Sequence, residues 1–69
     1  MSEKELYDIY DEVNRLLINN EMGFDLPTVE FSLDKARTLY YADDAKTLFL
    51  LKASLENLIE LNERSKKLD

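Results

Sequence analysis

The sequence predicts an all-α fold, a small antiparallel three-helix bundle with helices over residues 3–21, 26–41 and 44–67. Apolar side chains recur at three- and four-residue spacing in three successive segments. The chain contains one glycine and one proline, and both lie near the junction of the first two segments. With 69 residues and no repeat or long linker, the chain is expected to form a single domain over residues 1–69.

The first predicted helix has a start signal, an apolar stripe and an end signal. Ser2 is followed three residues later by Glu5, which is the pattern of a capping box. Gly23 stands where a left-handed C-terminal cap is expected, and Phe24 follows as its hydrophobic contact. The residues of the stripe are Leu6, Ile9, Tyr10, Val13, Leu16, Leu17 and Asn20.

The second predicted helix begins around Pro27, because proline is tolerated in a first helical turn. Its stripe is formed by Val29, Leu33, Ala36 and Tyr40. Asp43 and Asp44 interrupt this stripe, and either aspartate can cap a new helix. No glycine or proline marks the break, so the sequence leaves open one continuous helix from Thr28 onward. A turn around residues 41–44 is favoured, since a helix of about 40 residues would find little to pack on.

The third predicted helix is the longest and the most broadly apolar. Its main stripe is Leu48, Leu51, Leu55, Leu58, Ile59 and Asn62. Leu50 and Leu61 lie about 140–160° from the centre of that stripe at about 100° per residue. Apolar and neutral residues therefore cover about half of the helix surface, which is more than one surface helix needs. This pattern predicts that the third helix is the central element of the bundle.

The composition excludes several classes of function. The chain has no histidine and no cysteine, which removes the usual nucleophile, base and metal-ligand combinations and any disulfide. Fifteen acidic and nine basic residues give a net charge of -6, so a basic surface for direct nucleic-acid binding is not expected. Uncharged runs are too short for a membrane span of about 20 residues, and the start Met1–Glu5 does not have the pattern of a signal peptide. We therefore expect a cytoplasmic protein that is not an enzyme, with no cofactor and no metal.

Two clusters of carboxylates have ordinary structural interpretations. Glu56, Glu60 and Glu63 lie within one narrow arc of the third helix, where they could approach a cation. The same spacing allows pairing with Lys52 and Arg64, and pairing is the favoured interpretation.

The first half of the chain resembles a known family of regulators. A short helix, the Gly23–Phe24 turn and a second helix with Ser32, Asp34 and Tyr40 are similar to the helical-hairpin phosphatases of spore-forming bacteria, which act on response-regulator aspartyl phosphates. The resemblance implies a regulator centred on Ser32 and Asp34. The family's motif spaces serine and aspartate four residues apart, whereas here they are two apart. The activity is therefore not carried over to this chain.

The negative charge is concentrated in the first helix. Residues 1–22 hold six acidic and two basic side chains. One side of the helix carries Glu5, Asp8, Asp11 and Glu12. This side could make the protein an acidic decoy, a nucleic-acid mimic that blocks a nucleic-acid-binding protein. An ordinary solvated helix surface is the favoured interpretation, because Lys4 and Arg15 interrupt the acidic run.

Apolar residues outside the expected core predict a surface for another protein. Tyr10, Tyr40 and Phe49 are assigned to the core. The predicted contact residues are Tyr7, Ile18, Leu50, Asn57 and Leu61. They would form a homodimer seam or the binding site of a different partner, unless a wide central helix simply contacts both neighbours and leaves no patch. We expect a small protein-binding module that acts as a regulatory, accessory or inhibitory factor. Such small acidic helical proteins are often encoded by phages or mobile elements, and this class-level association favours that origin.

Overall fold

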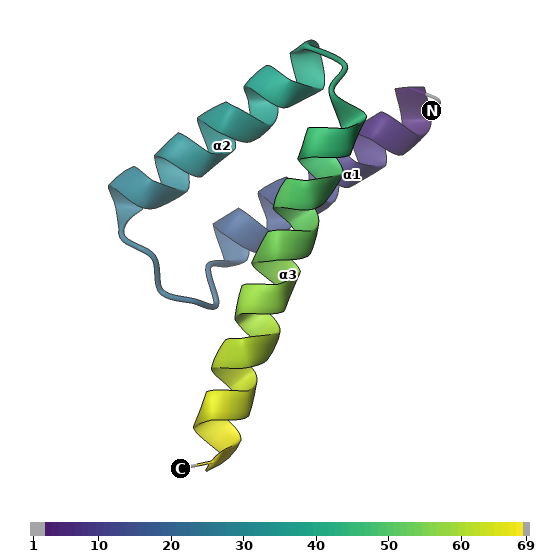
Figure 1. Cartoon of the computed structure of the whole chain (residues 1–69). Helices are drawn as coiled ribbons and strands as arrows, with labels where there is room; N and C mark the ends of the chain where they lie inside the picture. The colour runs from purple at the N-terminus through teal and green to yellow at the C-terminus, as the bar shows by residue number, and fades with distance from the viewer. Residues whose placement is uncertain (1–2, 69) are drawn as a thin grey trace.

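The computed structural model describes residues 3–68, with side chains as far as residue 66, and consists of three α-helices. They are α1 (Glu3–Asn19), α2 (Leu26–Tyr41) and α3 (Ala45–Leu68). Successive helices run in opposite directions, and each of the three helix pairs is in contact (Figure 1). The predicted three-helix bundle is confirmed, and each helix end lies within two residues of its predicted position.

Helix α1 ends at Asn19 because Asn20 adopts a left-handed backbone conformation, with φ of 49°. The Asn20 side chain accepts a hydrogen bond from the Phe24 N–H (2.8 Å) and donates one to the Phe24 carbonyl (2.9 Å). Gly23 also has positive φ, 72°, but it lies in the turn that follows the helix. The prediction that Gly23 caps α1 is therefore wrong, and Asn20 does so instead. The predicted capping box involves Ser2, which lies outside the described residues.

Residues 42–44 separate α2 from α3, so the alternative of one continuous helix is wrong. The Leu39 carbonyl accepts a hydrogen bond from the Asp44 N–H (3.0 Å), and the Tyr40 carbonyl accepts one from the Asp43 N–H (3.1 Å). These two bonds form a Schellman motif in which Asp43, with φ of 59°, occupies the left-handed position. Aspartate tolerates this conformation better than most residues, which explains how α2 ends without a glycine.

Asp44 caps the start of α3, as predicted for one of the two aspartates. Its Oδ1 accepts a hydrogen bond from the Thr47 N–H (3.1 Å), and its carbonyl accepts one from the Leu48 N–H (3.1 Å). Hydrogen bonding by Thr47, first through its side chain and then through its backbone, lowers the pKa of Asp44 below the ordinary value of 3.8. The cap therefore favours the charged carboxylate.

Removing the charge of this cap should reduce the acid sensitivity of the fold. Because the folded-state pKa of Asp44 is lowered, its contribution is complete above pH 3.8 and is lost as the pH falls through the lowered pKa. Asp44→Asn keeps an acceptor for the Thr47 N–H but does not titrate. Denaturant unfolding at a series of acidic pH values should therefore give a shallower loss of stability for Asp44→Asn than for the wild type. Asp43→Asn controls for the loss of one neighbouring charge, and equal acid dependence in Asp44→Asn and wild type would contradict the prediction.

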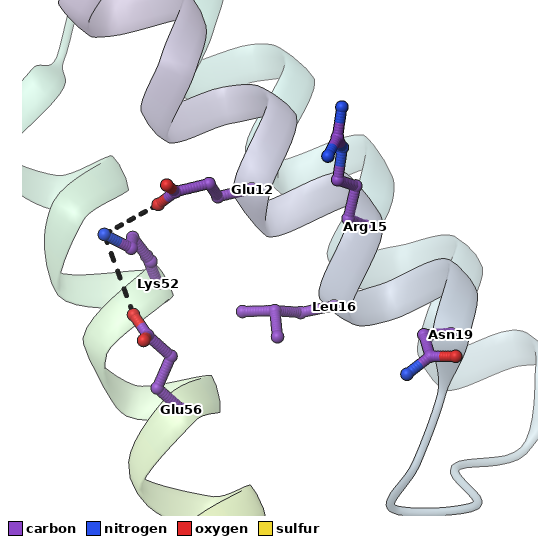
Figure 2. Close-up of a pocket in the computed structure, with 6 residues that line it drawn as sticks. All are labelled: Glu12, Arg15, Leu16, Asn19, Lys52 and Glu56. Atoms are coloured by element: carbon purple, nitrogen blue, oxygen red, sulfur yellow. Dashed lines mark ion pairs between the residues drawn. The ribbon is translucent and has the colours of Figure 1, made fainter.

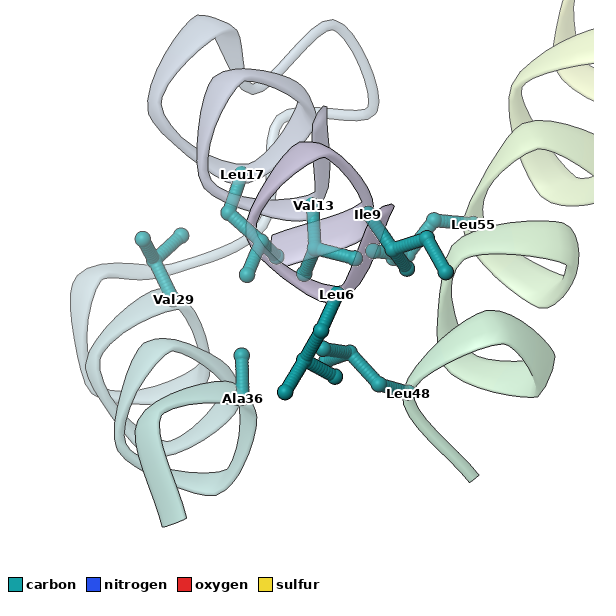
Figure 3. Packing of buried hydrophobic residues seen from close by; sticks show 8 residues of the cluster. All are labelled: Leu6, Ile9, Val13, Leu17, Val29, Ala36, Leu48 and Leu55. Carbon is teal, nitrogen blue, oxygen red and sulfur yellow. The ribbon is translucent and has the colours of Figure 1, made fainter. Parts of the chain in front are cut away.

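The hydrophobic core is built around α1, which lies between α2 and α3 (Figure 3). Four of the eight buried residues belong to α1, while α2 and α3 contribute two each. They are Leu6, Ile9, Val13, Leu17, Val29, Ala36, Leu48 and Leu55. The prediction that the third helix is central is therefore wrong, because its wide neutral surface is only partly covered.

The aromatic residues assigned to the core have two different outcomes. Tyr10 and Tyr40 are half-buried, and their rings stack at a centroid distance of 4.6 Å. Phe49 is 50% exposed, so its assignment to the core is wrong. The Lys52 ammonium lies 5.6 Å from the centroid of the Phe49 ring.

The C-terminal half of α3 extends away from the other two helices (Figure 1). With 24 residues, α3 is about 36 Å long at 1.5 Å per residue, whereas α1 has 17 residues. The last buried residue of α3 among those described is Leu55. The molecule is accordingly elongated, with principal extents of 42, 24 and 15 Å.

Candidate interaction surface

A row of uncharged side chains follows the outward side of α3. At about 100° per residue, its members fall within an arc of about 100°. They are Leu50, Ser54, Asn57, Leu58, Leu61 and Ser65, and all six are exposed. We call this set the α3 face. Its three leucines are exposed by 55%, 42% and 51%, in chain order, so the described domain does not cover them.

The charged residues of α3 lie outside this arc, with Lys46 and Arg64 at its edge. Lys52 pairs with Glu56, with an Nζ–Oε1 distance of 3.7 Å, and Arg64 pairs with Glu60. The predicted pairing is confirmed for Glu56 and Glu60. Among the described residues, no group of three or more acidic side chains is placed to hold a metal ion. The α3 face is therefore an apolar-to-neutral surface with its charges held elsewhere on the helix.

The predicted contact residues divide between two helices. Leu50, Asn57 and Leu61 lie together on the α3 face, while Tyr7 and Ile18 are exposed on α1. The Tyr7 ring meets the Tyr40 ring of α2 edge to face at a centroid distance of 6.3 Å. Ile18 follows Tyr7 by about three turns and so shares its side of α1. The structure thus brings three of the five residues together and places Tyr7 against α2.

Sequence reasoning missed Leu58, which it assigned to the core stripe. Leu58 is 42% exposed because it lies beyond Leu55, where α3 leaves the other helices. The signal that could have indicated this was the length of the third helix, since its neighbours are too short to cover all of it. Leu58 therefore belongs to the α3 face.

The exposed apolar residues of α2 do not form a comparable row. Leu26, Phe31 and Tyr41 are 68%, 69% and 78% exposed. At about 100° per residue, they spread over an arc of about 140°, and they are well separated along α2, so they form no continuous row. Scattered apolar residues of this kind are normal on protein surfaces. Among the described helices, the α3 face is the continuous apolar surface.

A hollow of about 420 Å³ lies between α1 and α3, and one ion pair spans the two helices (Figure 2). Its lining residues are Glu12, Arg15, Leu16, Asn19, Lys52 and Glu56. The Lys52 Nζ lies 2.7 Å from Glu12 Oε2, across the two helices. The hydrogen bond with Glu12 is the main cause that raises the pKa of Lys52 above its ordinary value. This arrangement ties α3 to α1 and keeps Lys52 charged.

The acidic side of α1 is partly neutralised within the domain. Glu12 pairs with Lys52, and Asp11 pairs with Arg15 at 3.0 Å. Glu5 and Asp8 are exposed on the same helix. Asp11 and Glu12, which belong to the side predicted for a nucleic-acid mimic, therefore already have basic partners in the structure.

The residues that resemble a phosphatase motif do not meet at one site. Ser32 is half-buried, whereas Asp34 is exposed and pairs with Arg37 at 3.6 Å. Because Ser32 and Asp34 are two residues apart, their side chains are rotated by about 200° around α2 and point to different sides. This geometry does not support a site that combines Ser32 with Asp34.

Comparison with known proteins gives no match to this chain among family models, curated proteins or solved structures. Within residues 3–68, no helix has both the length and the apolar character to cross a bilayer.

Proposed function

We propose that this chain is a small protein-interaction domain that acts as a regulatory, accessory or inhibitory factor in the cytoplasm. In this proposal the α3 face binds another protein chain, and Tyr7 and Ile18 offer a second contact surface on α1. The observation that carries the proposal is the exposure of Leu50, Leu58 and Leu61 on one uncharged side of α3. Contiguous exposed apolar surface on a soluble domain is typical of partner sites.

The spacing of the α3 face supports recognition by helix packing. Ser54 and Asn57 follow Leu50 by four and seven residues, and Leu58 and Leu61 continue the same side. Anchors at these intervals are used when an amphipathic helix docks against an apolar partner surface. The acidic decoy stays a prediction, and the ion pairs of Asp11 and Glu12 do not favour it.

A charge placed on the α3 face should prevent binding without unfolding the domain. Leu50→Asp buries no new charge in the isolated domain, because Leu50 is 55% exposed. At an interface, however, the new carboxylate would be desolvated and unpaired, and binding should weaken by about tenfold or more. The measurement is affinity capture from an extract of the cells that encode the protein, together with the oligomeric state by light scattering.

Phe31→Asp provides the matched control, since Phe31 is 69% exposed but lies on α2. It should leave capture and oligomeric state unchanged. Binding led by apolar contacts should also change little with ionic strength, whereas a complex led by the acidic side of α1 should weaken steeply. If Leu50→Asp stays folded and changes neither readout, the α3 face is not a binding surface and the proposal is wrong.

A further inference from the structure

We infer that the chain bound by the α3 face is a second copy of this protein, packed antiparallel along α3. This inference rests on the proposed function of the α3 face and adds the identity and orientation of its partner. It is carried by the surface area of the molecule, the residue pattern of α3 and the distribution of charge.

The surface of the single chain is larger than its mass requires. The accessible area is 5207 Å², whereas a compact monomer of 8.1 kDa exposes about 4,500 Å². The radius of gyration is 12.8 Å, compared with about 11 Å for a compact domain of this length. The excess of about 700 Å² is close to the roughly 800 Å² that each partner hides in a standard interface. One interface with a second copy would therefore account for the projecting half of α3.

One row of α3 residues has the alternating three- and four-residue spacing of a coiled-coil seam. Its members are Leu51, Ser54, Leu58, Leu61 and Ser65. Leu51 is half-buried and packs against the edge of the core, and the other four are exposed. In a parallel pair of α3 helices, each serine would face the same serine and leave a poorly filled layer. In an antiparallel pair, the two alternating positions of the seam face each other. Ser54 can then lie opposite the partner's Leu58, which pairs a small residue with a large one.

The charge of the molecule also favours the antiparallel orientation. Residues 1–44 contain 11 acidic and 4 basic side chains, a net charge of -7. The sequence of α3 contains 3 acidic and 5 basic side chains, and Arg64, Lys66 and Lys67 are close to its end. A parallel pair would place the two acidic parts side by side. An antiparallel pair separates them and brings the basic end of each α3 toward the acidic part of the partner.

The first test is the mass of the protein in solution over a concentration series, measured by sedimentation equilibrium. The wild type should form dimers, and Leu58→Asp should weaken dimerisation by about tenfold or more because it places a charge in the seam. Phe31→Asp, on α2, should dimerise like the wild type. Circular dichroism of each variant verifies that the helices are retained.

The second test measures orientation with spin labels on single cysteines, which is direct because the chain has no cysteine of its own. Labels on Asn57→Cys, near the middle of the α3 face, should be close together in the dimer. Labels on Ser65→Cys should be more than about 20 Å apart in an antiparallel pair, at 1.5 Å of rise per residue. In a parallel pair they would be about 10 Å apart, the separation of two packed helices.

A monomer at every concentration, or a short distance between the Ser65→Cys labels, would overturn the inference. If the protein is monomeric and Leu50→Asp still abolishes capture of another protein, only the identity of the partner is wrong and the proposed function holds. A third outcome is a dimer that forms equally well when a charge is substituted into the α3 face, with capture of other proteins also unchanged. In that case both the inference and the proposed function are wrong.

Discussion

Leu48→Ala is expected to lower the free energy of unfolding by about 3 kcal/mol. The Leu48 side chain is 0% exposed and lies in the core where α3 packs on α1 (Figure 3). A domain of 69 residues has a total stability of about 4–10 kcal/mol, so this one cavity would remove a large part of it. The thermal midpoint should fall by about 12–24 °C. Thermal and denaturant unfolding by circular dichroism measure both quantities, at one low protein concentration because dimerisation would add to the apparent stability.

The matched control is Leu58→Ala, which makes the same chemical change on the same helix. Leu58 is 42% exposed, so its truncation leaves no closed cavity and should cost less than about 1 kcal/mol. Equal losses in the two variants would mean that the C-terminal half of α3 is covered within the monomer. That result would contradict the exposure of the α3 face on which the proposed function depends.

The helices and their order could be predicted because their signals are local. Each signal depends on residues within one or two helical turns. The signals are the apolar spacing, Pro27 at the start of α2 and Asp44 at the start of α3. The end of α2 was predicted at residue 41, where the structure has it. The end of α1 was harder to predict, since α1 ends through Asn20 in a left-handed conformation. A glycine in the sequence is a clear signal for a left-handed position, whereas asparagine and aspartate are also common in caps, turns and helices. The cap of α1 was therefore predicted at the glycine, Gly23, whereas Asn20 forms it.

Helical spacing predicts which residues share a side of a helix, but it does not predict how far the neighbouring helices extend. Leu48 and Leu58 were both assigned to the core stripe of α3, yet only Leu48 is buried. The difference depends on where α1 and α2 end relative to α3. Phe49 has a different explanation, because it directly follows the buried Leu48 but points about 100° away from it around α3.

Part of the candidate surface followed directly from the sequence. Leu50, Asn57 and Leu61 had to share one side of α3 once residues 44–67 were predicted to form a helix. The position of Tyr7 depended on tertiary structure, because the side of α1 that faces α2 is set by the packing of the bundle. The central place of α1 was likewise missed. The broad apolar surface of the third helix indicated a central position, but it lies largely exposed.

Ala36→Leu is expected to lower the free energy of unfolding by about 1–3 kcal/mol, the largest effect we expect from enlarging a side chain in this protein. Ala36 is 0% exposed and points toward α1 from α2 (Figure 3). Ala36 belongs to the same buried cluster as Leu6 and Val13 of α1, so a larger side chain at residue 36 would meet them. The larger leucine would have to push α1 and α2 apart or adopt a strained rotamer, because the core is close-packed. Denaturant unfolding should show a lower midpoint with an unchanged slope if the variant keeps the native fold.

Lys35→Leu is the matched control, because it introduces the same side chain at the neighbouring position, which is exposed. Its effect should stay within about 0.5 kcal/mol. An Ala36→Leu variant as stable as the wild type would show that α1 and α2 have room for three more carbon atoms between them. That result would contradict close packing of α2 on α1 at Ala36.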